Sequence, residues 1–384
     1  MSPHDPADKL PSTGPGGTPR VSPHIAALAP YVPGRPEEEI AAKYGVKDPV
    51  KLASNENPLG PSPKALQAIR AHLSRIHRYP VSDGCELRKA ISEKLDVPMD
   101  GVVLGAGSSD LIECSAIAFL DRDENAVISE GAFIMYKISV QRVNGNIRWV
   151  PLKERTHDLQ AMASAINDKT KIVYIANPNN PTGTYVPAGE MAAFLESVPR
   201  GVLVVVDEAY REYIDRPDFP DTLRTVRSGA PNLVVLRTFS KVQGLAGLRI
   251  GMGIMHPELA REFHRVRSPF NSSRIGQVAA LAALDDRSHI RRSVAMNRRE
   301  KDFLEKAFAE RGIPFTPSVG NFVLLDVGCD PMKLFDRMCA RGVIIRPVAN
   351  YGFKESIRIT VGTHDQNSRL LEALDQALPE ARGR

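Results

Sequence analysis

The sequence lacks the features that mark secreted, membrane and nucleic-acid-binding proteins. Its four cysteines, Cys85, Cys114, Cys329 and Cys339, lie far apart and form no Cys-x-x-Cys pair. This pattern argues against a disulfide framework and a thiolate zinc site, and reduced thiols in a cytoplasmic protein fit better. No apolar run approaches the length of a membrane span. The 50 Lys and Arg against 45 Asp and Glu give a net charge of only +5 without a basic run, so neither nucleic acid nor a membrane is expected as a partner.

Nucleotide and metal motifs are also missing. The acidic run Val202–Glu208 resembles a strand of a P-loop ATPase, but no Gly-Lys pair occurs anywhere in the chain, so that class is excluded. Gly105-x-Gly107 is half of a dinucleotide fingerprint, yet Asp110 stands where the third glycine belongs. No His-Glu-x-x-His or comparable cluster is present, and no metal is expected.

Composition and periodicity predict the structure of the first part of the chain, up to about residue 76. Residues 1–23 contain His, Asp, Pro and Gly but no hydrophobic region, which predicts a disordered tail and no signal peptide. Ser62 is expected to cap a helix that has Pro63 in its first turn. Apolar residues at helical spacing are expected to form the buried stripe of this helix: Leu66, Ile69, Leu73 and Ile76.

From about residue 100 the pattern changes to short apolar runs that alternate with helical segments. The runs are Val102–Leu104, Ala126–Ser129, Ile172–Ala176, Val202–Val206, Leu233–Leu236 and Ile250–Ile254. Such runs are typical of strands buried on both faces of a mostly parallel sheet. We expect an α/β fold: a large domain (61–290) with this sheet flanked by helices, and a smaller α+β domain (24–60 and 291–384).

Polar residues follow four of the predicted strands. Gly105–Asp110 comes after the first run, Asn177–Gly183 after the third, Asp207–Tyr210 after the fourth and Arg237–Lys241 after the fifth. Asp207 alone is more often a strand-end cap, and Lys241 alone a surface residue. The Gly105–Asp110 loop alone is either a plain turn or a helix N-terminus suited to a phosphate. Together, at the carboxyl ends of strands, they predict one ligand site.

Several segments resemble the fold-type I aminotransferases, and among them the histidinol-phosphate aminotransferase family. The most specific are Asn179-Asn180-Pro181-Thr182-Gly183, Asp207-Glu208-Ala209-Tyr210, Thr238-Phe239-Ser240-Lys241 and Gly247-Leu248-Arg249-Ile250-Gly251. Further segments are Leu52–Pro58, Tyr31-Val32-Pro33-Gly34, Arg78-Tyr79-Pro80 and Ile357–Gly362. The resemblance runs in order from about residue 24 to residue 378.

The resemblance implies pyridoxal 5′-phosphate as the cofactor and assigns its ring contacts. Lys241 would hold the cofactor as a Schiff base and then act as acid and base. Asp207 would keep the pyridine nitrogen protonated, and Tyr210, the third catalytic residue, would bond the phenolic oxygen together with Asn180. Phe133 would stack on the ring, although a core aromatic is the competing interpretation.

The resemblance also implies a phosphate site and a homodimer. Ser108 and Ser109 would lie at the cofactor phosphate, with Ser240 and Arg249 closing over it. In the family, a tyrosine at the position of Tyr79 reaches the phosphate in the neighbouring subunit, although a tyrosine before proline is more often only a packed turn residue.

Substrate selection would fall to four further residues. Arg358 matches the arginine that takes the distal anion of the substrate, and Arg346, at the end of the strand Val343–Ile345, matches a second one. Tyr31 matches a tyrosine that reaches the substrate phosphate, and Asn321 would orient the substrate. A surface ion pair is the alternative for Arg346.

The implied reaction converts histidinol phosphate and 2-oxoglutarate into imidazole acetol phosphate and L-glutamate, a step of histidine biosynthesis. An aromatic amino-acid aminotransferase is the alternative, because Arg358 would hold an α-carboxylate as readily as a phosphate. A pyridoxal-phosphate decarboxylase of a phosphorylated amino acid is a third. A transcriptional regulator with an aminotransferase-like domain is improbable, because the short Pro- and Gly-rich start cannot form a helix-turn-helix.

Overall fold

The computed structural model describes residues 18–28, 30 and 34–383. Residues 1–32 form one unit and residues 33–384 another. Within the first unit, the short helix α1 covers Pro23–Ala26. Most of the predicted tail and Tyr31 lie outside the described residues.

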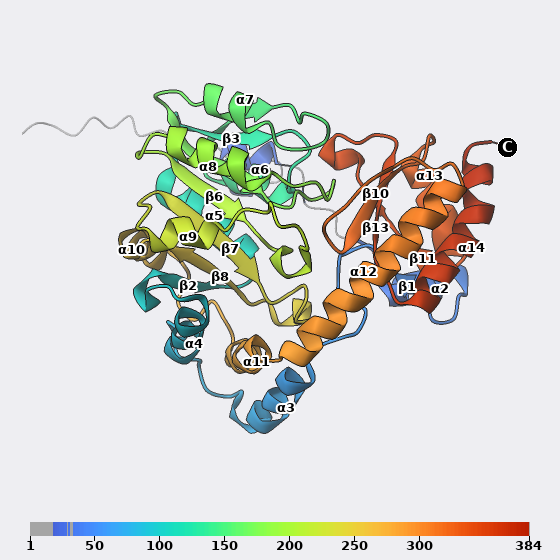
Figure 1. The fold of residues 1–384 in the computed structure, drawn as a ribbon, viewed down its shortest axis with the longest axis horizontal. Coiled ribbons are helices and arrows are strands. Elements are labelled where there is room, and N and C mark those ends of the chain that lie inside the picture. Colours follow the sequence, from blue (N-terminus) through green and yellow to red (C-terminus); the bar gives the residue numbers. More distant parts are fainter. Residues whose placement is uncertain (1–17, 29, 31–33, 384) are drawn as a thin grey trace, which may run out of the picture. The chain divides into compact units, whose positions relative to one another are not determined.

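A seven-stranded sheet forms the centre of the second unit (Figure 1). Its order is β2-β8-β7-β6-β5-β3-β4, and β8 is antiparallel to both of its neighbours while the other pairs are parallel. The strands are β2 Val102–Gly105, β3 Asn125–Ser129, β4 Asn146–Val150, β5 Thr170–Ala176, β6 Leu203–Asp207, β7 Leu233–Thr238 and β8 Gly251–Met255. The six predicted runs are all strands, within two residues at each end, and the predicted α/β class is confirmed.

Alternate residues of each central strand point to opposite faces of the sheet, and helices cover both. Val204 and Val206 pack with one set of helices, while Leu203 and Val205 pack with another. The first set is α3 Pro63–His72, α4 Cys85–Leu95, α7 Leu159–Ser164, α8 Ala188–Ser197, α9 Thr222–Arg227 and α11 Arg274–Leu284. The second is α5 Ser108–Phe119, α6 Ile134–Arg142 and α10 Pro257–Val266. Burial on both faces explains why these strands are apolar throughout.

Two smaller sheets are formed by the last part of the chain together with β1 from its first part. An antiparallel sheet has the order β12-β13-β10-β9, and β1 pairs in parallel with β11. The elements here are α2 Glu37–Tyr44, β1 Val50–Lys51, β9 Phe315–Thr316, β10 Phe322–Asp326, α13 Pro331–Ala340, β11 Val343–Ile344, β12 Arg346–Pro347, β13 Ser356–Thr360 and α14 His364–Ala381. The strand expected at Val343–Ile345 is observed as β11, and Arg346 begins a separate strand, because the chain leaves β1 after Ile344 and joins β13 at Arg346.

Helix α12, Arg287–Glu310, connects the two regions (Figure 1). Its second half packs against β10 and α14 through Leu304 and Phe308. Near its start, Ser293 accepts a hydrogen bond of 2.8 Å from the Asn57 amide, which also donates to the carbonyl of Val242 at 2.8 Å. The expected domain division at residues 60 and 290 stays a prediction, and α12 runs through the second of these positions without a break.

The apolar stripe predicted for the helix after Ser62 is only partly right. Ser62 does cap α3, since its hydroxyl accepts a bond from the Ala65 amide. However, Leu73 and Ile76 lie beyond the end of α3 and are 51% and 65% exposed, and Leu66 is 37% exposed. The prediction of burial was therefore wrong for Leu66, Leu73 and Ile76. Helical periodicity indicates that a helix has an apolar face, but it does not indicate what covers that face.

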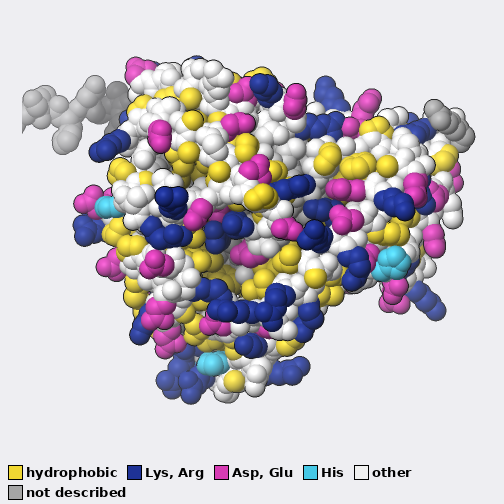
Figure 2. Space-filling model, in the orientation of Figure 1, with side chains coloured by type: hydrophobic (Ala, Val, Ile, Leu, Met, Phe, Trp, Pro, Cys, Tyr) yellow, Lys and Arg dark blue, Asp and Glu magenta, His cyan; other side chains and the backbone are white. Residues whose placement is uncertain are grey.

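Side chains of both charge signs are spread over the face drawn in Figure 2, in keeping with the small net charge. Among the residues that the structure describes, no helix has the length and apolar character needed to cross a lipid bilayer.

Candidate active site

Three parallel neighbours in the central sheet bring the predicted residues to one edge. Ala176 at the end of β5 is in register with Asp207 at the end of β6, and Asp207 with Leu236 of β7. Asn180 follows β5 by four residues, and Lys241 follows β7 by three. Their convergence therefore results from the parallel pairing that the apolar runs predicted.

The loop after β2 forms an anion cradle at the start of α5. Ser108 and Ser109 are the first two residues of this helix, whose initial N–H groups have no helical acceptor. Gly107 has a φ of +84°, and a Cβ on Gly251 would lie 2.6 Å from the Ser108 nitrogen. Glycine at 251 therefore lets the loop lie against β8. Asp110 turns away from the cradle, since its carboxylate accepts from the Ala106 amide and the Asn271 side chain.

The side chain of Arg249 lies over this loop. Its guanidinium approaches the Ser240 hydroxyl and the Ala106 carbonyl, both at 3.4 Å. A Cβ on Gly107 would lie 2.5 Å from the same guanidinium, so glycine is needed for the close approach. A cation, two hydroxyl groups and free helix N–H groups thus surround one small space, which suits a phosphate.

Lys241, three residues after β7, is half-buried. Its Nζ donates to the Ser54 carbonyl at 3.3 Å and lies 5.4 Å from the centre of the Tyr210 ring. Burial, and then the charge of Arg358, lower the pKa of Lys241 to about 8, and Arg249 acts in the same direction. A substantial fraction of this amine is therefore neutral near pH 8, as a nucleophile requires.

Asp207 is 5% exposed at the end of β6. Its Oδ1 accepts from the Ala209 amide at 3.1 Å, and its Oδ2 from the hydroxyl of Tyr136 at 3.3 Å. Burial raises the pKa of Asp207 to about 6, although both of these bonds and Lys241 oppose the shift. The sequence prediction did not include Tyr136, whose only signal was its position three residues after Phe133.

Tyr210 belongs to a buried network of amides. The Asn55 side chain donates to the Tyr210 hydroxyl at 2.9 Å, and the Asn321 side chain donates to the Asn55 carbonyl at 3.0 Å. Tyr210 also packs edge-on against Phe322, with 5.0 Å between the ring centres. Asn55 was missed as a contact of Tyr210 because 155 residues separate them.

Arg358 and Arg346 face the same space from the four-stranded sheet. They are direct cross-strand partners on β13 and β12, so their side chains share one face. Arg358 is 5% exposed and donates to the Asn180 side chain at 2.5 Å and to the Ala53 carbonyl at 2.6 Å. The first bond joins the four-stranded sheet to the loop that follows β5, and the second joins it to the segment that follows β1.

Phe133 and Tyr79 occupy different surroundings. Phe133 immediately precedes α6, and its ring meets Tyr136 edge-on at 5.8 Å. The ring of Tyr79 stacks on Phe270 with 4.7 Å between centres, and its side chain is 77% exposed. Tyr79 therefore presents its ring to the outside of the single chain.

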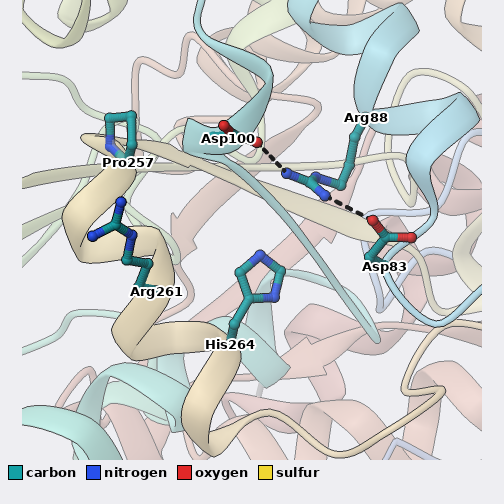
Figure 3. A pocket seen from close by; sticks show the side chains of 6 residues that line it. All are labelled: Asp83, Arg88, Asp100, Pro257, Arg261 and His264. Carbon is teal, nitrogen blue, oxygen red and sulfur yellow. Dashed lines mark hydrogen bonds and ion pairs between the residues drawn. The ribbon is translucent and has the colours of Figure 1, made fainter.

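A second hollow, of about 380 Å³, is lined by Asp83, Arg88, Asp100, Pro257, Arg261 and His264 (Figure 3). The buried Arg88 pairs with Asp83 at 3.0 Å and with Asp100 at 3.5 Å. It also donates to the carbonyls of Met99 and Val102. Arg88 thus ties α4 to β2, and the cluster is structural. Within the described ranges, no group of His, Cys, Asp and Glu side chains is arranged to hold a metal.

Comparisons with known proteins define the class. Residues 47–374 match the model of the family "Aminotransferase class I and II". The chain is 44% identical over 358 residues to histidinol-phosphate aminotransferase 1 of Nitrosococcus oceani, covering 93% of this chain and 96% of the relative. It is 47% identical over 362 residues to histidinol-phosphate aminotransferase 2 of Pseudomonas fluorescens, with 94% and 97% covered.

A solved structure agrees with the sequence comparison. The histidinol-phosphate aminotransferase of Sinorhizobium meliloti, in complex with pyridoxal-5′-phosphate, superimposes with a TM-score of 0.86 at 30% identity, covering 94% of this chain and 98% of that one. The chain belongs to the class I and II aminotransferases, which use pyridoxal phosphate, and among them to the histidinol-phosphate aminotransferase family.

Proposed function

We propose that this transaminase interconverts histidinol phosphate plus 2-oxoglutarate and imidazole acetol phosphate plus L-glutamate in histidine biosynthesis. The names of its relatives support this reaction. Pyridoxal phosphate, when bound, supplies the electron sink for the carbon–hydrogen bond that breaks. In the proposal, Lys241 binds the cofactor covalently and then moves the proton, and Asp207 pairs with the ring nitrogen.

The remaining cofactor contacts follow from the geometry of the cradle. Ser108 and Ser109 would bind the phosphate with the first N–H groups of α5, while Ser240 and Arg249 cover it. Asn180 and Tyr210 would bond the phenolic oxygen, and Phe133 would pack against the ring. The glycines at 107 and 251 support this assignment, because side chains there would collide with Arg249 and with the loop.

The observation that carries the substrate assignment is the arginine pair. Like charges directly opposite on neighbouring strands destabilise a sheet, and Arg346 stands directly opposite Arg358. An anion between the two guanidinium groups removes this repulsion. Histidinol phosphate brings a phosphate and glutamate a carboxylate, so one arginine pair would serve both half-reactions. Asn321 would orient the substrate indirectly, through Asn55: the side-chain amide of Asn321 donates a hydrogen bond to the backbone carbonyl of Asn55. The proposed contact of Tyr31 lies outside the described residues.

Among amino donors added singly, histidinol phosphate should remove the absorption band of the Lys241-bound cofactor at the lowest concentration. The measurement is the visible absorption of the cofactor bound to Lys241, followed as histidinol phosphate, glutamate, phenylalanine or tyrosine is added. Histidinol, which lacks the phosphate, is the control ligand for the contribution of the phosphate group. Arg346→Gln should weaken the response to histidinol phosphate by roughly 10- to 100-fold, as expected for a lost charge-assisted bond. The response to histidinol should stay as it is.

Preferential discharge by phenylalanine or tyrosine would instead make the protein an aromatic aminotransferase. Release of carbon dioxide from a phosphorylated amino acid would indicate a decarboxylase. A purified protein that never shows the absorption band would refute the cofactor assignment as well.

We further propose that the active form is a homodimer in the cytoplasm. Exposed apolar side chains gather in the segment that follows α3: Leu73, Ile76, Tyr79 and Val81, with Phe270 stacked on Tyr79. A patch of this kind marks a protein contact. A second copy on this face would cover the patch and place Tyr79 at the cofactor phosphate of its partner.

Ile76→Asp should therefore convert the dimer into monomers with little activity, because a carboxylate at a covered apolar contact costs several kcal/mol. Met332→Asp is the matched control, since Met332 is 50% exposed on α13, away from the patch. Sedimentation velocity gives the mass of each variant. A dimer in which Ile76→Asp has no effect would place the interface elsewhere.

A further inference from the structure

Tyr136 lies between two of the proposed cofactor contacts. It projects from α6, is completely buried, and donates its hydroxyl to Oδ2 of Asp207 at 3.3 Å. Its ring also meets the ring of Phe133 edge-on, with 5.8 Å between centres and 87° between planes. One side chain therefore contacts both the proposed partner of the pyridine nitrogen and the proposed stacking ring.

The ring of Tyr136 is held in place from its other side. It stacks on Tyr174 of β5 with 4.9 Å between centres and 9° between planes. The Tyr174 hydroxyl bonds Ser115 of α5 at 2.8 Å, and that serine donates to the carbonyl of Ile112 at 2.6 Å. The stack is anchored on two elements, so the direction of the Tyr136 hydroxyl is fixed by packing rather than by Asp207.

The contacts of Asp207 leave room for the cofactor. Oδ1 accepts one N–H from Ala209, and Oδ2 accepts the hydroxyl of Tyr136. An ionised carboxylate has about four lone-pair sites, so it can accept a further N–H. The two protein donors approach different oxygens and thereby fix the rotation of the carboxylate.

We propose that Tyr136 is a positioning residue, which orients the Asp207 carboxylate and keeps it ionised for the protonated ring nitrogen. The inference rests on the proposed pairing of Asp207 with that nitrogen. Tyr136 touches neither substrate nor cofactor in this scheme and acts through Asp207 and Phe133.

The electrostatics of the site agree with this role. Burial raises the pKa of Asp207 to about 6; the Ala209 amide, the Tyr136 hydroxyl and Lys241 oppose the rise, and Glu208 adds to it. Burial and the charge of Asp207 also hold the pKa of Tyr136 well above its usual value, with Tyr174 and Tyr210 adding to the shift. Tyr136 therefore remains a hydroxyl donor throughout the working range of pH.

Tyr136→Phe removes the hydroxyl and leaves the stack. The test is the affinity of the cofactor-free protein for pyridoxal phosphate, measured as a function of pH. At neutral pH the affinity should fall about tenfold, the usual size for a lost bond to a charged group. Because the lost donor favoured the carboxylate, the pKa of Asp207 rises, and the acid limb of the affinity profile should move upward by about one pH unit.

Tyr174→Phe is the matched control, since it removes a hydroxyl from the neighbouring ring, which bonds Ser115 and not Asp207. It should lower thermal stability while leaving the acid limb in its wild-type position. An unchanged profile in Tyr136→Phe, or an equal shift in both variants, would overturn the inference. A wild-type protein that binds no pyridoxal phosphate would overturn the proposed function itself, and this role of Tyr136 with it.

Discussion

Replacing Lys241 with alanine should abolish turnover and the covalent attachment of the cofactor, while the fold and part of the cofactor affinity should persist. The amine is the only part of the proposed site that can both bind the cofactor covalently and carry a proton. Its single bond to the Ser54 carbonyl contributes little to stability, so the melting temperature should change by only a few degrees. Single-turnover assays and the visible spectrum measure the two losses separately.

Lys301→Ala is the matched control for this experiment. Lys301 is also a half-buried lysine that donates to a backbone carbonyl, that of Ser318 at 2.5 Å, and burial lowers its pKa as well. It lies on α12, outside the cradle, so its loss should leave the absorption band and turnover unchanged. Robust turnover by Lys241→Ala would contradict the assigned mechanism.

Asp207→Asn should slow the chemical steps far more than it weakens cofactor binding. The neutral amide keeps the shape of the carboxylate but does not keep the ring nitrogen protonated. Loss of one partner from a buried charge pair costs about 3–5 kcal/mol, which corresponds to a rate roughly 10²- to 10⁴-fold lower. The cofactor retains its phosphate contacts, so its dissociation constant should rise by a much smaller factor.

The neighbouring residue gives the contrasting result. Glu208 is equally buried, but it pairs with Arg237 at 2.8 Å and accepts a hydroxyl bond from Thr222. Glu208→Gln should therefore lower the free energy of unfolding and leave the rate per folded molecule nearly unchanged. An Asp207→Asn enzyme with the wild-type rate would remove Asp207 from its proposed role.

The central sheet was predictable because most of its strands are buried on both faces, and such strands have uninterrupted apolar sequences. Strand β4 was not predicted, since its sequence Asn146-Ile147-Arg148-Trp149-Val150 mixes polar and apolar residues. It lies at the sheet edge, where only Val150 is buried. For the apolar residues Leu73 and Ile76 after α3, burial was predicted but exposure is observed. The sequence pattern is the same whether the core of the same chain or a second chain covers such residues.

The convergence of residues at the strand ends was predictable, because parallel pairing brings these ends to one edge of the sheet independently of loop conformation. Asn55 and Tyr136 were missed for a different reason. Each acts on a site residue through one hydrogen bond, to Tyr210 and Asp207 respectively, that joins distant parts of the sequence. Burial and the charge of Arg358, a residue distant in the sequence, are the two largest causes of the lowered pKa of Lys241.

Helix α12 has no break between Arg287 and Glu310. Its second half packs against β10, and Ile290 and Val294 in its first half pack in the cluster that contains Val242. There Ser293 bonds the amide of Asn57, which also bonds the carbonyl of Val242, the residue next to Lys241. Helix α12 is thus one continuous connection between the four-stranded sheet and the backbone beside Lys241.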